Sequence, residues 1–532
     1  MSSVGISTVG TWSYNVGIAV YAYQETGSTA WVALATAGRY VPALIITSVG
    51  SRLADRLPRG TVAVSADLIC AIVMVALTAV AFLHGPILLA IALAALSSGV
   101  ARVQSAAALA SAADLVPESR LARTAAAIST TEAVATAVGP AVASLVLAVA
   151  PPATLFALNG ATFAASAALV ASVTSRPRAA VRGRVAVATP SQPGVDLASV
   201  RRLVWPLLAV RTIASVVYGM DVVLLAVIAT NQLRQGTSGY GWLLAATGAG
   251  GLFAAGWLSS RGDAGRSTLR SVLGMALYSL PLLAFMASPA LPGSLGVQVL
   301  RGAGSVLVSA TVVVGLQSTV PSASSGRIFG LAHVLVMVGT SVGALVTPLV
   351  LGAWGLDTTL LLAALLPLVA TLGLVPALRR FDRTGAIAMA ELEPRVSVLR
   401  RMTLFDDASR STLYAVADSL REVRCDNGDV VVAQGERSDA LYILVTGSAE
   451  VFVDSPDGPT PVRVMAAPTY FGEIGLIRAV PRTATVVARE PCTLWRIPAQ
   501  TFLDAAGQAG LSGALTDGVH TRLEAGRFAA TG

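Results

Sequence analysis

Six residues in one short stretch near the C-terminal end have the types that bind a phosphate group. They are Gly472, Glu473, Ile474, Gly475, Arg482 and Thr483. Glycines let the backbone approach an anion closely, and the N–H groups at the start of a short helix can cradle it. Arg482 supplies a guanidinium fork for phosphate oxygens, and Thr483 adds an N–H and a hydroxyl. Glu473 accepts hydrogen bonds, so it suits a hydroxyl of the same ligand. The stretch therefore predicts a site for a compact phosphate anion.

Short β-branched runs alternate with glycine turns from residue 402 onward and surround this stretch. The runs are DVVVAQGE, ALYILVTGSAEVFVD, PVRVMAA, TATVVARE and TLWRIP. Strands of this length between glycine-rich turns predict a small β-barrel or jelly roll, with short helices near 409–420 and after 498. We therefore predict an α+β domain over 402–510, followed by a C-terminal helix and tail over 511–532.

The motifs of this domain resemble the cyclic-nucleotide-binding domain shared by bacterial catabolite-activator-type regulators, kinase regulatory subunits and gated channels. The likeness spans 402–505 and lies in Gly428-Asp429, Gln434-Gly435, Asp439, Leu441-Tyr442-Ile443-Leu444, Gly447, the run FGEIGL and the run PRTAT. It includes both ends of the family's phosphate-binding cassette, and the spacing from the glutamate to the arginine agrees with the family.

The resemblance implies that the six residues bind a cyclic nucleotide, with Arg482 on the phosphate and Glu473 on the ribose 2′-hydroxyl. We expect cAMP, since bacterial domains of this kind mostly bind it; cGMP is the alternative, because the Thr483 hydroxyl can meet a guanine amino group. The resemblance also implies a lid helix after the barrel, which we place at 512–524, with Leu511, Leu515 or Leu523 over the base. A barrel that keeps the fold and binds nothing is the other hypothesis.

The composition of the whole chain excludes a purely soluble protein. Of 532 residues, 12% are charged and 54% are apolar, and the mean hydropathy is +0.71. A soluble globular chain carries about 25% charged residues. Apolar runs of about 20 residues, long enough to cross a bilayer, recur in two groups of six. They lie near 3–23, 30–50, 62–83, 86–108, 124–149 and 153–174, and near 203–229, 239–259, 268–288, 291–316, 328–353 and 357–378.

These runs predict an all-α polytopic domain of twelve transmembrane helices in two bundles, 1–174 and 203–378. The polar, basic segment 175–202 is expected to be a cytoplasmic connector, and 379–401 a linker that is helix-compatible up to Pro394. The first run has no basic flank and no clear cleavage site, so we favour a transmembrane helix over a secretory signal.

The distribution of arginine predicts the orientation in the membrane, because cytoplasmic loops carry the excess of positive charge. The chain has no lysine, and one set of alternating loops holds nearly all the loop arginines. These are Arg52, Arg56, Arg59, Arg120, Arg123, Arg176, Arg178, Arg182, Arg184, Arg201, Arg202, Arg261, Arg266, Arg270 and Arg327, against Arg234 in the opposite set. We therefore expect a plasma-membrane protein with both termini and the nucleotide domain in the cytoplasm. The arginines lie between apolar runs and not on one polar domain, so we expect no nucleic-acid binding.

Two runs in the membrane part resemble the major facilitator superfamily. GSRLADRLPRG, residues 50–60, is similar to its loop signature, although Ser51 and Pro58 stand where the family has glycine. Residues 114–147 resemble the fourth-loop and fifth-helix pattern of its drug and siderophore exporters, and include the pair Gly139-Pro140. The halves also echo each other at a spacing of a little over two hundred residues, as in transporters built from repeats. The resemblance implies alternating access to a midplane site, with a cytoplasmic gate at Asp55, Arg56 and Arg59.

Eight ionisable residues lie inside the predicted spans, where charge is costly and marks functional candidates. They are Arg39, Asp67, Arg102, Glu132, Arg211, Asp221, Arg301 and His333. We take Arg39, Glu132 and Asp221 as candidates for transport or coupling. Asp221 is expected to face the cavity, where its protonation would couple export to protons, while Arg39 suits either a cavity or a structural ion pair. Asp67, Arg102 and Arg301 are expected near helix ends, with their charged groups at the membrane interface.

The remaining motifs exclude other classes of function. The three cysteines are far apart, which favours neither disulfides nor a zinc site. The sequence shows no catalytic triad, metal cluster or nucleotide-hydrolysis loop, so we expect no enzyme, cofactor or bound metal. The sequence thus predicts a secondary-active exporter of an unidentified small molecule, regulated by cyclic nucleotide. The alternatives are a nucleotide-sensing receptor that does not transport, and a transporter whose nucleotide domain only tethers or dimerises it.

Overall fold

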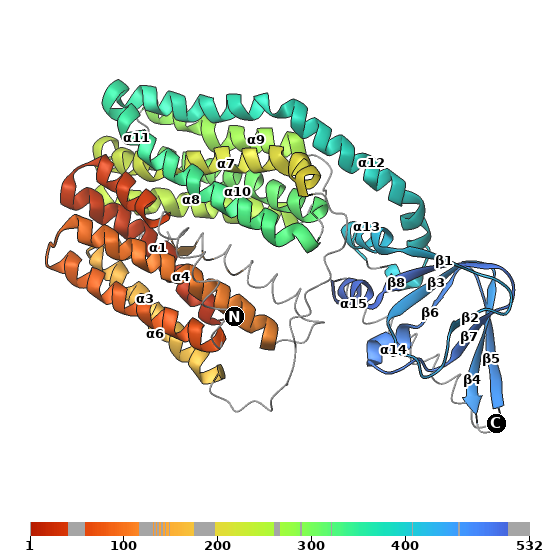
Figure 1. Ribbon diagram of the computed structural model, residues 1–532. Coiled ribbons are helices and arrows are strands. Elements are labelled where there is room, and N and C mark those ends of the chain that lie inside the picture. Colours follow the sequence, from red (N-terminus) through yellow and green to blue (C-terminus); the bar gives the residue numbers. More distant parts are fainter. Residues whose placement is uncertain are drawn as a thin grey trace. The chain divides into compact units, whose positions relative to one another are not determined.

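A computed structural model shows two compact units, one before and one after the Gly385–Ala386 bond (Figure 1). We call the first the membrane unit and the second the C-terminal unit. The structure describes residues 2–40, 59–115, 149–174, 197–259, 267–287, 290–320, 322–406, 408–455 and 458–508, and isolated positions between 131 and 147.

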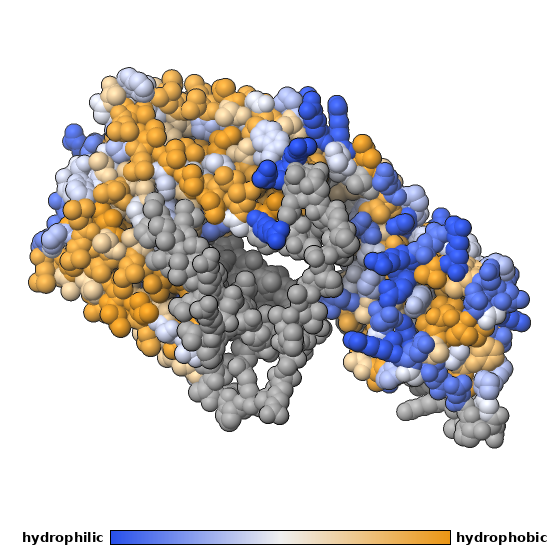
Figure 2. Space-filling model, in the orientation of Figure 1, coloured by the Kyte–Doolittle hydropathy of each residue, from blue (hydrophilic) through white to orange (hydrophobic). Residues whose placement is uncertain are grey.

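Helices make up the membrane unit. In chain order they are α1 (Ser2–Thr26), a helix over 29–40, α3 (Arg59–Phe82), α4 (Ile87–Leu115), α6 (Ala153–Thr174), α7 (Leu197–Val227) with a π turn η1 (Ile228–Gln232), α8 (Gly236–Ser259), α9 (Ser267–Ser279) with a 3₁₀ turn η2 (Leu280–Ala287), α10 (Leu291–Thr319) and α11 (Ser322–Gly373). Within the described ranges, eight helical segments are long and apolar enough to cross a membrane. Figure 2 shows hydrophobic residues over much of the visible face of this unit. The predicted helical membrane domain is confirmed.

Small residues let neighbouring helices of this unit approach each other closely. A Cβ on Gly250 of α8 would lie 1.9 Å from the Val299 carbonyl oxygen of α10, and a Cβ on Gly302 of α10 would lie 1.8 Å from the Thr247 carbonyl oxygen of α8. Contacts of this kind replace hydrophobic burial as the packing force between helices in a bilayer. The α8–α10 contact matters below, because Arg301 stands beside Gly302.

The last helices before the C-terminal unit differ from expectation in the linker. α11 contains a kink at Gly355, whose φ of 78° only glycine adopts easily, and this kink separates the two predicted spans 328–353 and 357–378. α12 (Val375–Leu399) then runs as one helix through Pro394, where we expected the helix to end. Proline inside a helix costs about 3 kcal/mol, and the complete burial of Val396 and Leu399 offsets that cost.

Two antiparallel four-stranded sheets form the C-terminal unit, so the predicted β fold is confirmed. One sheet has the order β1-β8-β3-β6 and the other β2-β7-β4-β5. The strands are β1 (Arg421–Cys425), β2 (Val430–Val432), β3 (Ala440–Thr446), β4 (Ser448–Ser455), β5 (Gly458–Ala466), β6 (Thr469–Phe471), β7 (Thr485–Ala488) and β8 (Cys492–Pro498). One apolar core includes Leu444, Val451, Phe471 and Leu494, which come from both sheets.

Helices pack against the first of these sheets. They are the C-terminal part of α12, the short turn η3 (Thr403–Phe405), α13 (Arg410–Ser419) and α15 (Ala499–Gln508). Their apolar side chains form a second core with Leu441 and Ile443 of β3 and Ile497 of β8. One further helix, α14 (Glu473–Arg478), follows β6 directly. The six predicted phosphate-binding residues lie on this helix and beside it.

Candidate functional site

The cassette around α14 places its glycines and arginine against one another. β6 ends at Phe471, and Gly472 then turns the chain into α14 with a φ of 91°. After α14 the chain returns through Arg482 to β7. A Cβ on Gly472 would lie 2.4 Å from Nη1 of Arg482, so the glycine makes room for the guanidinium.

Arg482 is buried, with 5% of the residue exposed, and its position is fixed from both sides. Its backbone N–H donates to the Glu436 carbonyl at 2.8 Å, and its carbonyl accepts from the Gly435 N–H at 2.9 Å. In the side chain, Nη2 donates to the Ala440 carbonyl at 2.8 Å and Nη1 to the Gly472 carbonyl at 3.3 Å. A guanidinium has five N–H donors, so donors remain for a ligand beside these bonds.

Asp439 holds the same guanidinium by charge. Its Oδ1 lies 3.3 Å from Nη2 of Arg482, and its Oδ2 lies 2.7 Å from Nη2 of Arg496 on β8. Partial burial favours a raised pKa for Asp439, but the hydrogen bond and charge of Arg496 and the charge of Arg482 outweigh it and hold the pKa below its ordinary value. Asp439 therefore stays ionised at neutral pH and orients Arg482. The sequence placed Asp439 only within a family motif and did not predict this role.

The structure brings the other cassette residues into the same turn of chain. Glu473 begins α14 and is 3% exposed. Gly475 is buried, and a Cβ added to it would lie 1.9 Å from Oγ of Ser438. Ile474 is half-buried and Thr483 is exposed. The predicted roles of these residues toward a nucleotide stay predictions.

Replacing Gly472 by alanine should lower nucleotide affinity roughly tenfold, because the new Cβ displaces Arg482. Gly435→Ala is the matched control: its φ is 84°, but nothing lies within 4 Å of the added Cβ. Both variants should lose about 1–2 kcal/mol of stability from left-handed strain, and only Gly472→Ala should lose affinity. Calorimetric titration of the full chain with cAMP measures this difference. Equal affinities in the two variants would mean that the space beside Arg482 is unimportant.

A second polar network lies inside the membrane unit. Nη2 of Arg301 on α10 is 2.5 Å from Oδ1 of Asp221 on α7, and both side chains are almost fully buried. Nε of Arg301 donates to the Tyr278 carbonyl at 2.9 Å, and Nη1 donates to Oε1 of Gln298 at 3.1 Å. The hydroxyl of Thr247 donates to the same Gln298 oxygen at 3.1 Å. The expectation that Arg301 reaches the interface is therefore wrong: it is completely buried and pairs with Asp221.

The other charges predicted within spans have different surroundings. Asp67 was also expected near the interface, and that prediction is wrong, since the residue is completely buried and accepts from the Ser166 hydroxyl at 2.7 Å. Arg39 is 7% exposed, and its Nη1 donates to Oδ1 of Asn15 on α1. Arg211 is half-buried and donates to the Ser309 hydroxyl. Residues Glu132, Asp55 and Arg56, and the side chain of Arg59, lie outside the described residues.

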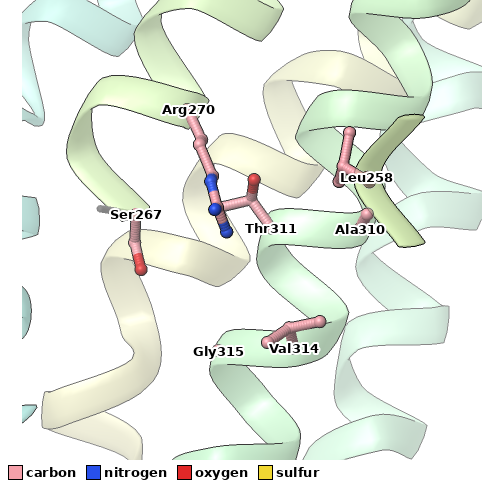
Figure 3. A pocket seen from close by; sticks show the side chains of 7 residues that line it. All are labelled: Leu258, Ser267, Arg270, Ala310, Thr311, Val314 and Gly315. Carbon is pink, nitrogen blue, oxygen red and sulfur yellow. The ribbon is translucent and has the colours of Figure 1, made fainter. Parts of the chain in front are cut away.

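A small pocket in the membrane unit is not lined by any of these charged residues. It is lined by Leu258 of α8, Ser267 and Arg270 of α9, and Ala310, Thr311, Val314 and Gly315 of α10. Figure 3 shows the Arg270 guanidinium directed toward Thr311. The pocket contains none of the candidate transport residues.

Comparisons with known proteins match both units. The family model "Major Facilitator Superfamily" matches residues 1–344, and the model "Cyclic nucleotide-binding domain" matches residues 422–508. Neither is an enzyme family.

Two curated relatives share part of the chain. A cAMP-dependent protein kinase regulatory subunit of Yarrowia lipolytica is 31% identical over 136 residues, which are 26% of this chain and 33% of that protein. The acetyltransferase Pat of Mycolicibacterium smegmatis is 36% identical over 108 residues, 20% of this chain and 32% of that one. The chain thus spans about a third of the length of these relatives.

Solved structures resemble about a quarter of the chain. The sensor domain of the transcriptional regulator DNR from Pseudomonas aeruginosa is 26% identical, with coverage of 25% of this chain and 90% of that chain and a TM-score of 0.24. The regulatory domain of Toxoplasma gondii PKA, crystallised with cAMP, is 26% identical, with coverage of 28% and 55% and a TM-score of 0.23.

Proposed function

The chain belongs to the Major Facilitator Superfamily and carries a cyclic nucleotide-binding domain, and on this premise we propose that it is a transporter whose activity is set by cAMP. The observation that carries the regulatory part is the arrangement of Arg482: it is buried, oriented by Asp439, and retains donors for a phosphate. The likeness to a subunit named for cAMP dependence supports cAMP over cGMP as the ligand.

The proposed transport mechanism is alternating access between two six-helix bundles, 1–174 and 203–378, in a twelve-helix membrane domain. In this proposal 175–202 is the cytoplasmic connector, 379–401 joins the membrane domain to the nucleotide domain 402–510, and 511–532 forms a lid and tail. The likeness of residues 114–147 to exporters favours export. The arginine distribution favours a plasma-membrane location with both termini in the cytoplasm.

Flux measurements in vesicles test this function against its alternatives. Purified full-length protein is reconstituted into vesicles, and a panel of radiolabelled small molecules is offered. Flux is measured with and without cAMP on the side of the vesicle membrane that holds the nucleotide domain. We expect at least one compound to move, and its rate to change with cAMP. Movement of any compound excludes a pure receptor, and flux that changes with cAMP excludes a nucleotide domain that only tethers; flux that ignores bound cAMP contradicts the proposed regulation.

The Asp221–Arg301 pair yields a further prediction about transport. Asp221→Asn leaves Arg301 buried without its counter-charge, which costs about 3–5 kcal/mol, so the melting temperature should fall. Flux should fall as well, because the one carboxylate of this network can no longer carry a proton or release Arg301. The double variant Asp221→Asn/Arg301→Gln should recover most of the melting temperature, since a neutral pair needs no counter-charge, but it should not recover flux. If Asp221→Asn transports normally with normal pH dependence, Asp221 is only structural and Glu132 becomes the next candidate.

A further inference from the structure

Arg39 is a buried cation without a carboxylate partner among the described residues. Its hydrogen bond there goes to the neutral amide oxygen of Asn15, its guanidinium lies 5.9 Å from the centre of the Tyr40 ring, and its Nε–H has no hydrogen-bond partner. A buried charge that is neither paired nor fully hydrogen-bonded costs several kcal/mol, and inside a membrane such groups mark pathways for polar substrates. Arg39 therefore needs an explanation that packing alone does not supply.

The groups around Arg39 are hydrogen-bond donors and aromatic rings from both halves of the membrane unit. Tyr14 of α1 is 2% exposed, and its hydroxyl lies close to the Arg39 guanidinium without forming a hydrogen bond of normal geometry. Tyr218 of α7 and Tyr240 of α8 lie within electrostatic range of both Arg39 and Asp221. Asp221, the carboxylate that the described residues place near these tyrosines, is already bound to Arg301 at 2.5 Å. Among the described residues, the site thus has a buried guanidinium N–H without a partner and no carboxylate bound to it.

A second group of basic residues lies on α4, α7 and α11. Arg102 of α4 and Arg211 of α7 are both within electrostatic range of His333 on α11. Arg211, like Arg39, binds a neutral partner, the Ser309 hydroxyl. In the described part of the spans, the hydrogen-bond partners of both Arg39 and Arg211 are therefore neutral groups. A cationic substrate would meet repulsion here and would leave Arg39 unpaired.

We infer that the translocated substrate is an organic anion whose carboxylate or phosphate group binds Arg39, with the Tyr14 hydroxyl as a second donor. The rings of Tyr218 and Tyr240 contact the apolar body of the same molecule. This inference rests on the proposed transport function, and it assigns the substrate class that the function leaves open. Binding the anion gives the Nε–H and the Tyr14 hydroxyl a common acceptor and neutralises the buried charge. The protein with the anion bound is therefore the state suited to change access from one side of the membrane to the other.

Binding measurements with matched probes test the substrate class. The melting temperature of the purified full-length protein in detergent is measured in the presence of each probe at millimolar concentration. The anions are benzoate and phenyl phosphate, the cation is benzylamine, and the neutral molecule is benzyl alcohol. Tryptophan fluorescence reports mainly the membrane unit, because six of the seven tryptophans precede residue 386. They are Trp12, Trp31, Trp205, Trp242, Trp257 and Trp354. At least one anion should raise the melting temperature, and the amine and the alcohol should not.

Variants of Arg39 tie the effect to the site. Arg39→Gln should weaken anion binding about tenfold or more, as expected for the loss of a charged hydrogen-bonding pair. Arg39→Lys keeps the charge and should retain part of the affinity, which separates loss of the site from failure to fold. Arg380→Gln, an exposed arginine on α12, is the matched control and should bind the anion like the parent protein.

The outcomes separate this inference from the proposed function. If no anion stabilises the protein, if benzylamine binds as well as the anions, or if Arg39→Gln binds them normally, the substrate class is wrong whatever the vesicles show. If the anions bind through Arg39 but vesicle flux is absent for every compound, the anion site stands and the transport function fails.

Discussion

Arg482→Ala should weaken cAMP binding by about thirtyfold or more, because loss of one partner in a buried charged hydrogen bond costs roughly 2–5 kcal/mol. The Arg482 side chain is almost fully buried, so its charged hydrogen bonds are shielded from water. The change also removes the bonds to the Ala440 and Gly472 carbonyls, and this should lower the stability of the C-terminal unit. Titration calorimetry of the full-length protein measures the affinity, and thermal melting measures the stability.

Arg478→Ala is the matched control for this variant. Arg478 stands in the last turn of α14, four residues before Arg482, but its side chain is exposed. The two variants remove the same charge from the same cassette, so bulk electrostatics alone would weaken both equally. We expect near-normal affinity for Arg478→Ala. Normal cAMP affinity in Arg482→Ala would refute the assignment of the phosphate site.

The cassette could be predicted from the sequence because its chemistry is local. Gly472, Glu473 and Arg482 lie within one turn, one short helix and the next loop, so their spacing along the chain nearly fixes their spacing in space. The β-branched runs fixed the strands for the same reason, since alternation and turn residues act over a few positions. Asp439 escaped prediction because its contacts with Arg482 and Arg496 depend on strand pairing, over 43 and 57 positions.

Buried charges in the membrane unit could not be placed from the sequence. Arg301 lies ten positions into α10, where a long side chain could equally reach the interface, and its burial depends on Asp221, 80 positions away on α7. Asp67 is similar, because its partner Ser166 is 99 positions away on α6. Hydropathy identifies that a segment crosses the bilayer but not which side faces a neighbouring helix. Pro394 could not be interpreted from the sequence for a similar reason. Proline disfavours a helix interior, but burial of Val396 and Leu399 after it outweighs that preference.

α12 is fixed at its N-terminal part to the membrane unit. Leu378 and Phe381 are buried in an apolar cluster of that unit with residues of α7 and α10. Asp382 accepts hydrogen bonds from the backbone N–H groups of Ser267 and Thr268 at 3.1 and 3.0 Å and from the Thr268 hydroxyl at 2.7 Å. These bonds satisfy donors at the start of α9, so a displacement of α12 at this point acts directly on a membrane helix.

The C-terminal part of the same helix belongs to the core of the C-terminal unit. Val396 and Leu399 are completely buried there, and Arg395 donates to the Ala417 carbonyl of α13 at 3.3 Å. Between the two anchored parts the helix is solvent-accessible, with Ile387 62% exposed. We expect a continuous helix to transmit rotation and displacement, whereas a flexible chain transmits neither.

A seven-residue Gly-Ser insert after Ala390 should therefore abolish the effect of cAMP on flux without changing cAMP binding or basal flux. A nucleotide that favours one transport state tenfold shifts the equilibrium by about 1.4 kcal/mol, and this shift is lost once the anchored parts are uncoupled. The matched control is an insert of seven helix-forming residues at the same point, which keeps the helix continuous and returns it to within about 20° of its original phase. We expect that control to retain most of the regulation, measured as the ratio of flux with and without cAMP in vesicles. Equal regulation with both inserts would show that the signal passes through direct docking on the cytoplasmic loops and not along α12.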